Sequence, residues 1–213
     1  MGWAAIDFET ANADRASACA LGLVVVQESQ VVKRHSWLIR PSKLCFDLNN
    51  VMLHGITADH VAEMPTFAEL WDQVHLEIQG MPLVAHNASF DIGVLKHTLD
   101  DYKIPYPASD YYCTRAISQA LWPALPSYGL ELVSVYLGIP FTHHAVEEDA
   151  MACAAIVLRG CSELGVGDLP QLAERLMIRR GHLDPRPTHT GAQTKKRTVS
   201  PASSQGGRNE RGV

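Results

Sequence analysis

The sequence predicts an α/β domain with a mixed central sheet and helices on both faces, and three observations support this. Strand-like segments at 3–6, 21–27 and 31–39 precede any helical pattern, which favours antiparallel pairing at the start of the sheet. Later strand-like segments, 81–85 and 111–114, alternate with helical patterns, as in parallel sheets. Segment 81–85 is also apolar without alternation, as expected for a strand covered on both faces.

Local signals delimit the individual elements. Polar residues 27–30 separate two β-branched runs and predict a hairpin. Thr66 and Glu69 form a capping box before an apolar periodicity, so a helix should start there and end at Gly80. Ser89 is expected to cap another helix. Residues 41–59 are interpreted as a loop, and the remaining helices are predicted at 115–121, 130–137, 148–164 and 169–178.

Length and composition fit one domain with a tail. The chain has 213 residues, of which 46% are hydrophobic, and a single domain is expected over residues 1–180. From Gly181 onward there are six Lys/Arg residues, two Asp/Glu residues and no apolar pattern, which predicts a disordered basic tail over 181–213. The net charge of −5 offers no basic surface for wrapping duplex nucleic acid.

Several classes of protein are disfavoured. No apolar run approaches the roughly 18 residues of a membrane helix, and the N-terminal segment does not resemble a signal peptide. The five cysteines form no CxxC pair, which argues against both a disulfide framework and a zinc site. We therefore expect a cytoplasmic protein without membrane contact.

Asp7 and Glu9 follow the first predicted strand directly. In a strand, residues i and i+2 point to the same side, and open α/β sheets carry their sites at the carboxyl ends of strands. Two adjacent carboxylates repel each other unless a cation lies between them. For this pair alone, a solvated acidic turn is the alternative interpretation.

The second candidate segment runs from His86 to Asp91, where a buried strand leads into a helix. Asp91 falls near the first helical turn, where the helix dipole favours a carboxylate. Ser89 and Asp91 could be plain capping residues. However, His86 and Asn87 are polar groups at the end of a buried strand and need partners.

The third candidate segment places His144 five residues before Asp149, which opens an alanine-rich helix. Small side chains would let this helix lie close to the sheet and bring Asp149 to its edge. A histidine on the preceding loop is a candidate general base near pH 7. His143 is the competing choice, but the residue five positions after it is Glu148. Surface histidines and an acidic helix start are the alternative interpretation.

Together, four carboxylates are predicted at one edge of the sheet, those of Asp7, Glu9, Asp91 and Asp149. Oxygen ligands suit Mg²⁺ or Mn²⁺ rather than zinc. The cluster fits phosphodiester hydrolysis with two divalent metal ions roughly 3.5–4 Å apart. One ion would lower the pKa of a water molecule and the other would stabilise the leaving oxygen.

The three segments resemble the motifs of the DEDDh (DnaQ-like) exonuclease family, which includes the polymerase proofreading subunit, RNase T and oligoribonuclease. The resemblance covers roughly residues 3–165, including the flanking segments 54–57 and 65–67. It implies a ribonuclease H-like fold and 3′→5′ removal of single nucleotides. It also implies catalytic roles for five side chains, with His144 deprotonating the attacking water and the metal ions held by Asp7, Glu9, Asp91 and Asp149.

The resemblance further implies contacts to the terminal nucleotide from Thr10, His54, His86, Asn87 and Phe90. For Phe90 the alternative is a place in the core, and for His54 a place on a surface loop. Basic residues 195–197 are interpreted as a solvated charge run, with nonspecific attraction of nucleic acid as the alternative.

The expected substrate is the 3′ end of single-stranded nucleic acid, DNA in preference to RNA, in proofreading or DNA repair with a separate polymerase or repair partner. An exoribonuclease acting on RNA ends or short oligoribonucleotides is the second hypothesis. A non-catalytic partner in a polymerase or repair complex is the third, and it is disfavoured because all five catalytic side chains are present.

Overall fold

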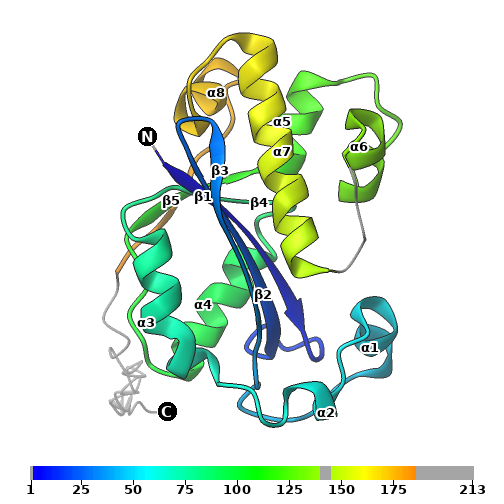
Figure 1. The fold of residues 1–213 in the computed structure, drawn as a ribbon, viewed down its shortest axis with the longest axis vertical. Helices are drawn as coiled ribbons and strands as arrows, with labels where there is room; N and C mark the ends of the chain where they lie inside the picture. The colour runs from blue at the N-terminus through cyan, green and yellow to red at the C-terminus, as the bar shows by residue number, and fades with distance from the viewer. Residues whose placement is uncertain (1, 140–144, 186–213) are drawn as a thin grey trace, which may run out of the picture.

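The computed structural model describes residues 2–139 and 145–185. At its centre is a six-stranded sheet with the order β3-β2-β1-β4-β5-β6 (Figure 1). Antiparallel pairs join β1, β2 and β3, parallel pairs join β1, β4 and β5, and β6 is antiparallel to β5. The predicted mixed sheet is therefore confirmed, with strands β1 (Trp3–Thr10), β2 (Ala18–Gln27), β3 (Gln30–Leu38), β4 (Leu83–Ala85), β5 (Ser109–Cys113) and β6 (Gly181–Leu183).

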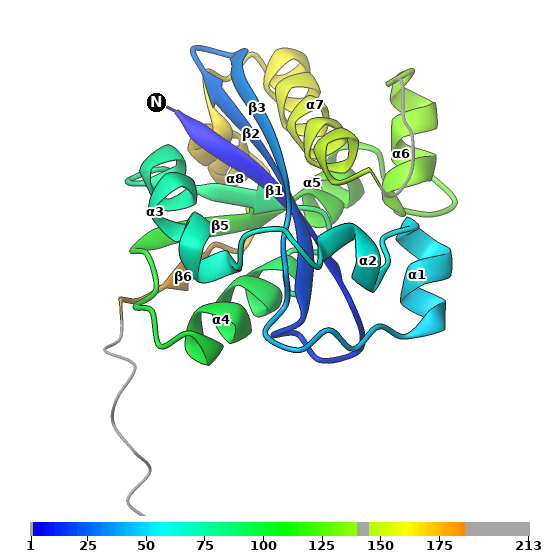
Figure 2. The same ribbon diagram turned by 60° about the horizontal axis from the view of Figure 1, so that its bottom comes forward.

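Helices cover both faces of the sheet, as predicted. Helices α3 (Phe67–Ile78) and α4 (Asp91–Asp101) lie on one face (Figures 1 and 2). Side chains of β1 alternate between two cores: Ile6 and Phe8 pack with α3 and α4, whereas Trp3 and Ala5 pack with the opposite helices. The opposite face carries α5 (Thr114–Leu121), α6 (Leu130–Leu137), α7 (Val146–Leu164) and α8 (Leu169–Arg175).

The predicted hairpin between residues 27 and 30 is confirmed. Glu28 and Ser29 have φ angles of 50° and 61°, and Gln27 pairs with Gln30. A two-residue turn with both central φ angles positive matches the right-handed twist of the strands. The predicted helix from Thr66 is also present, because the Thr66 hydroxyl accepts from the Glu69 backbone N–H and the Glu69 side chain caps in return.

Two local predictions were wrong. The segment 41–59, interpreted as a loop, contains α1 (Leu48–His54) and the start of α2 (Ala58–Val61). Helix α1 has no buried residue, so its sequence carries no apolar periodicity that would predict a helix. The second wrong prediction is that Ser89 caps a helix. The N-cap position of α4 is Phe90, and no side chain caps that helix.

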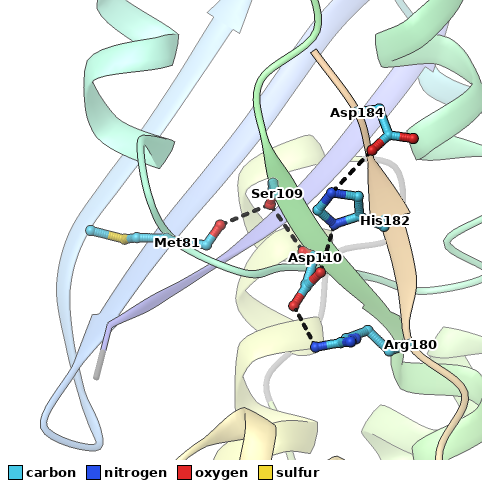
Figure 3. Close-up of polar contacts among 6 residues, drawn as sticks. All are labelled: Met81, Ser109, Asp110, Arg180, His182 and Asp184. Carbon is cyan, nitrogen blue, oxygen red and sulfur yellow. Dashed lines mark hydrogen bonds and ion pairs between the residues drawn. The ribbon is translucent and has the colours of Figure 1, made fainter. Parts of the chain in front are cut away.

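The predicted domain boundary at residue 181 also needs correction. Residues 181–183 form β6 on the edge of the sheet, where Leu183 is buried. Asp110 of β5 holds the strand through Arg180, at 3.1 Å, and through His182, at 2.7 Å (Figure 3). Gly181 is required there, because a Cβ would overlap the ring of Tyr111. The rest of the predicted tail, from residue 186, lies outside the described residues.

Among the described residues, no single helix is long and apolar enough to cross a membrane. Helices α7 and α8 are long and apolar enough for a membrane span only when the two are taken together, and they are bent by 62° at their junction.

Candidate active site

Asp7 and Glu9 lie at the carboxyl end of β1, on the sheet face that α7 covers. They are two residues apart in one strand, so their side chains share a face, as the alternation predicted. The β1–β2 pairing shifts between Glu9 and Thr10, because Glu9 pairs with Ala20 and Thr10 with Ala18. Such a bulge ends regular pairing and re-aims the side chains beside it.

Gly22 of β2 lets the start of α7 approach this face. It pairs directly with Asp7 across the two strands. A Cβ on Gly22 would overlap the carbonyl group of Val146, the first residue of α7. The helix therefore packs on the bare backbone of β2, and buried alanines along its length continue the close contact. The predicted close approach of this helix is confirmed.

This approach brings Asp149 to Asp7 and Glu9. Ligand oxygens of the three carboxylates lie within 4.8 Å of one another, and Glu9 and Asp149 are buried. Glu148 faces elsewhere, because its carboxylate pairs with Arg34 of β3 at 3.0 Å. Asp149, rather than Glu148, is thus the α7 carboxylate of the cluster.

Asp91 reaches the same end of β1 from the other side of the sheet. It begins α4, is 1% exposed, and accepts a hydrogen bond at Oδ1 from the Phe8 backbone N–H at 3.0 Å. It is not within the group of three whose oxygens lie close together, because α4 covers the opposite face. Asp91 nevertheless lines the same cavity as the other three carboxylates.

The carboxylates raise one another's pKa. Burial, followed by the charges of Asp149 and Asp91, raises the pKa of Glu9 to about 8. Burial raises the pKa of Asp91 to about 7, and burial with three carboxylate neighbours holds that of Asp7 well above its usual range. When these carboxyl groups lose their protons, their negative charges repel one another. A divalent cation bound between them would stabilise the ionised carboxylates. Three oxygen donors within reach of one point fit Mg²⁺ or Mn²⁺.

Comparison with known proteins identifies the family to which this arrangement belongs. A family model described as "Exonuclease" (RNase_T) matches residues 4–157, which include every carboxylate of the cluster. The chain belongs to the exonuclease family. The resemblance to DEDDh exonucleases and the expectation of a nuclease are thereby confirmed.

Relatives of this exonuclease include proteins named as DNA polymerase III or as one of its subunits. It is 30% identical over 155 residues to the DNA polymerase III subunit epsilon of Treponema pallidum, covering 70% of this chain and 71% of that protein. It is 29% identical over 164 residues to the PolC-type DNA polymerase III of Clostridium perfringens, covering 74% of this chain. The matched part is only 11% of that much longer polymerase.

Solved structures confirm the ribonuclease H-like fold. A structure of exonuclease X in complex with 5′ overhanging duplex DNA has a TM-score of 0.62 and 23% identity, covering 82% of this chain and 99% of the other. The nuclease domain of 3′hExo, a DEDDh family member bound to rAMP, has a TM-score of 0.65 and 18% identity, covering 76% and 92%. At these identities the likeness establishes the fold alone.

A cavity of about 280 Å³ opens over the carboxylates of this exonuclease. That volume is slightly below the range of about 300–1,000 Å³ that is usual for sites of drug-sized ligands. Three of the predicted substrate residues, His86, Asn87 and Phe90, line it, whereas Thr10 and His54 do not.

Thr10 and His54 instead support the wall of the site. The Nε2–H of His54 donates to the Thr10 carbonyl at 3.1 Å, and its Nδ1 accepts from the Ile56 backbone N–H at 3.0 Å. Asn50 also donates to the Thr10 carbonyl, at 2.9 Å. Burial lowers the pKa of His54, which is consistent with this neutral form. These bonds fix α1 to the end of β1, and Leu53 of α1 lines the cavity.

His86 is held on both sides of its ring. Its Nδ1 lies 2.9 Å from the Thr114 hydroxyl and its Nε2 lies 2.8 Å from the Tyr128 carbonyl. Burial lowers its pKa. Because a carbonyl oxygen can only accept, the Nε2–H donates to Tyr128. Asn87 has a φ of 62°, a left-handed conformation that asparagine tolerates, at the turn into α4. Phe90 is half-buried, packs against the core and also lines the cavity, so its contact with a nucleotide stays a prediction.

The predicted general base, His144, and its competitor His143 lie outside the described residues. The described chain resumes at Ala145, immediately before α7 and the Asp149 carboxylate. The role of His144 as general base therefore stays a prediction from the motif spacing.

Sequence reasoning missed four residues that shape this site. Leu53 and Leu130 line the cavity, and Asn50 and Gly22 position its walls. Only Gly22 carried a usable signal, since a glycine inside a β-branched run marks close backbone approach. The others belong to exposed or short helices whose packing partners are distant in sequence.

Proposed function

We propose that this chain is a metal-dependent 3′→5′ exonuclease that releases nucleoside 5′-monophosphates from single-stranded DNA. The observation that carries the proposal is the meeting of the Asp7, Glu9 and Asp149 carboxylates within 4.8 Å, with Asp91 on the same cavity. The names of the relatives, DNA polymerase III subunits and a 3′-5′ exonuclease DinG of Staphylococcus epidermidis, support both the direction and the DNA substrate.

In this proposal the four carboxylates would hold two divalent ions, which would supply activation of the attacking water and charge stabilisation at the leaving 3′-oxygen. The oxygen of the water forms the new bond to phosphorus, and the bond from phosphorus to the 3′-oxygen breaks. The water's proton passes to His144, and the 3′-oxygen takes up a proton to become the new 3′-hydroxyl. Asp91 stays fixed by the Phe8 N–H while this happens. His86 and Phe90 form one wall of the cavity that receives the terminal nucleotide, and Leu53 lies on it as well.

A second candidate is an exoribonuclease acting on RNA ends. One structural neighbour, the nuclease domain of 3′hExo, is bound to rAMP. A separate polymerase or repair partner, and with it a proofreading or repair role, is proposed because the epsilon relative is named as a subunit. The proposed location is the cytoplasm, which five free cysteines support.

The test uses single-stranded DNA and matched RNA, each labelled at the 3′ or the 5′ end, with Mn²⁺ or EDTA. We expect immediate release of the 3′ label as a mononucleotide, and a 5′-labelled ladder that shortens one residue at a time. EDTA should stop both. Faster RNA cleavage would favour the second candidate, and early release of the 5′ label would contradict the direction. No cleavage with Mn²⁺ would favour a non-catalytic role.

A further inference from the structure

One arginine next to the carboxylate cluster has no part in the proposed chemistry so far. Arg15 lies on the loop between β1 and β2 and is exposed. Its Nη1–H donates to the Ser89 carbonyl at 2.8 Å, and its guanidinium lies 5.8 Å from the centre of the Phe90 ring. Phe90 lines the catalytic cavity, so this cation is separated from the cavity by a single side chain.

The loop that carries Arg15 is held in place by its own hydrogen bonds. The Asp14 backbone N–H donates to the Asn12 side chain at 2.8 Å, and the Ala16 N–H donates to the Asp14 side chain at 2.9 Å. The Ser17 hydroxyl donates to the Asp14 carbonyl at 2.6 Å. The guanidinium is therefore presented from a fixed backbone, which reduces the entropy lost when it binds a ligand.

Gly93 makes room for the guanidinium on the surface of α4. A Cβ at this position would overlap Nη1 of Arg15, so the side chain lies flat against the helix backbone. The stacked ring and the carbonyl bond orient the guanidinium without neutralising it. The place is electrostatically costly for a cation, because it lies at the N-terminal end of α4, where the helix dipole is positive. Within residues 2–139 and 145–185 no ion pair holds this guanidinium, which leaves it suited to bind an anion.

Geometry places this cation at the edge of the catalytic cavity. Phe90, over whose ring the guanidinium lies, lines the same cavity as Asp7 and Asp149. Arg15 therefore borders the cavity that would receive the 3′ end of the substrate. In a 3′→5′ exonuclease the scissile linkage is the last one, so every other phosphate of the substrate lies on its 5′ side.

We propose that the Arg15 guanidinium binds the substrate phosphate that precedes the scissile linkage, and that Phe90, Ser89 and Gly93 position it for this contact. The proposal rests on the proposed exonuclease function. Arginine suits the role because its planar fork can donate two hydrogen bonds to one phosphate while its face stacks on an aromatic ring. The contact would make cleavage depend on a second phosphate. Substrates with several phosphates would therefore be cleaved faster than substrates with only the scissile one.

The experiment compares two substrates in Mn²⁺. One is a single-stranded oligonucleotide, and the other is the p-nitrophenyl ester of thymidine 5′-monophosphate, which contains one phosphodiester and no second phosphate. Arg15→Ala should lower kcat/KM on the oligonucleotide roughly 10–100-fold, as for loss of a charged hydrogen bond. It should leave cleavage of the ester unchanged. Arg159→Ala, which removes an exposed arginine paired with Glu163, is the matched control and should change neither.

Two further measurements separate phosphate binding from a structural role. An oligonucleotide with an uncharged methylphosphonate at the penultimate linkage should be a poor substrate for the wild type, but should lose little further with Arg15→Ala. Gly93→Ala should displace the guanidinium and reproduce the oligonucleotide defect at an unchanged melting temperature. The proposal would be overturned if Arg15→Ala lost as much activity on the ester as on the oligonucleotide. It would also be overturned if the methylphosphonate lowered the activity of Arg15→Ala as much as that of the wild type. If the wild type cleaves neither substrate, the proposed function itself fails.

Discussion

Two acidic sites lie at opposite ends of the parallel strands. They differ in whether basic side chains of the protein neutralise their negative charge. At the start of β5, Asp110 is paired with Arg180 and His182 (Figure 3). At the end of β1, Asp7 and Glu9 face Asp149, another carboxylate. The first site neutralises its charge within the chain and fastens an edge strand. The second accumulates like charges, which stabilises nothing unless a cation is bound. The contrast distinguishes an acidic group that supports the fold from acidic groups that serve a ligand.

The largest expected effect is on hydrolysis. Asp7→Asn removes one ligand charge from the cluster and should lower turnover on single-stranded DNA by on the order of 10³-fold or more, because several kcal/mol of charge stabilisation are lost. The matched variant, Asp110→Asn, makes the same chemical change at the paired site and should retain activity. Steady-state assays with Mn²⁺ measure both. Full activity in Asp7→Asn would contradict the claim that the β1 carboxylates, unlike Asp110, serve catalysis.

The general base gives the next effect. His144→Ala should lower turnover roughly 10²–10⁴-fold, the usual contribution of general base catalysis, and should change metal affinity little. His143→Ala should be far milder. An inactive His143→Ala beside a normal His144→Ala would shift the third motif by one residue. Glu148 would then replace Asp149 as the fourth carboxylate, which would conflict with the Arg34–Glu148 ion pair seen in the structure.

The stability of the metal-free protein should fall as the pH rises, and bound metal should weaken this dependence. Burial and like charges raise the pKa of Glu9 from 4.5 to about 8, so the folded state holds its proton more tightly than the unfolded chain. The associated stability is present below about pH 4.5 and is lost as pH rises through about 8. The melting temperature of the EDTA-treated protein should therefore fall over this window. Mn²⁺ should flatten the curve, and Asp7→Asn should reduce its slope. A metal-free melting temperature that rises from pH 5 to 8 would contradict the repulsion.

The smallest effect concerns the paired site. Ending the chain after Arg180 removes β6 and its buried Leu183, and should cost about 1.5–3 kcal/mol in the free energy of unfolding. Ending it after Pro185 should cost nothing measurable. Asp110→Asn should cost only about 0.2–1 kcal/mol, because the pairs it breaks are partly exposed. Denaturant unfolding would distinguish these values, and an unfolded Pro185 truncation would show that later residues support the core.

The two sites also differ in how far sequence could predict them. The mixed sheet was predicted correctly. The Asp7–Glu9 alternation and the Asp149 helix start are local signals, and these three of the four predicted carboxylates lie together in the structure. Strand β6 has three residues and depends on Gly181 fitting a ring some seventy positions away, which no local pattern reveals.

The supporting residues were unpredictable for the same reason. Helix α1 buries no residue, and its role depends on Asn50 and His54 reaching Thr10, forty and forty-four positions earlier. Arg15 meets Ser89 across 74 positions. Motif spacing locates the reacting groups, whereas the contacts that orient them form only on folding.

The most direct test of the central claim is the number of Mn²⁺ ions that the protein binds at neutral pH, measured by electron paramagnetic resonance of the free ion. The wild type and Asp110→Asn should each bind two ions, and Asp7→Asn should lose at least one. Binding that is absent in the wild type, or identical in Asp7→Asn, would contradict the claim that the like-charged carboxylates of β1 and α7 form a metal site.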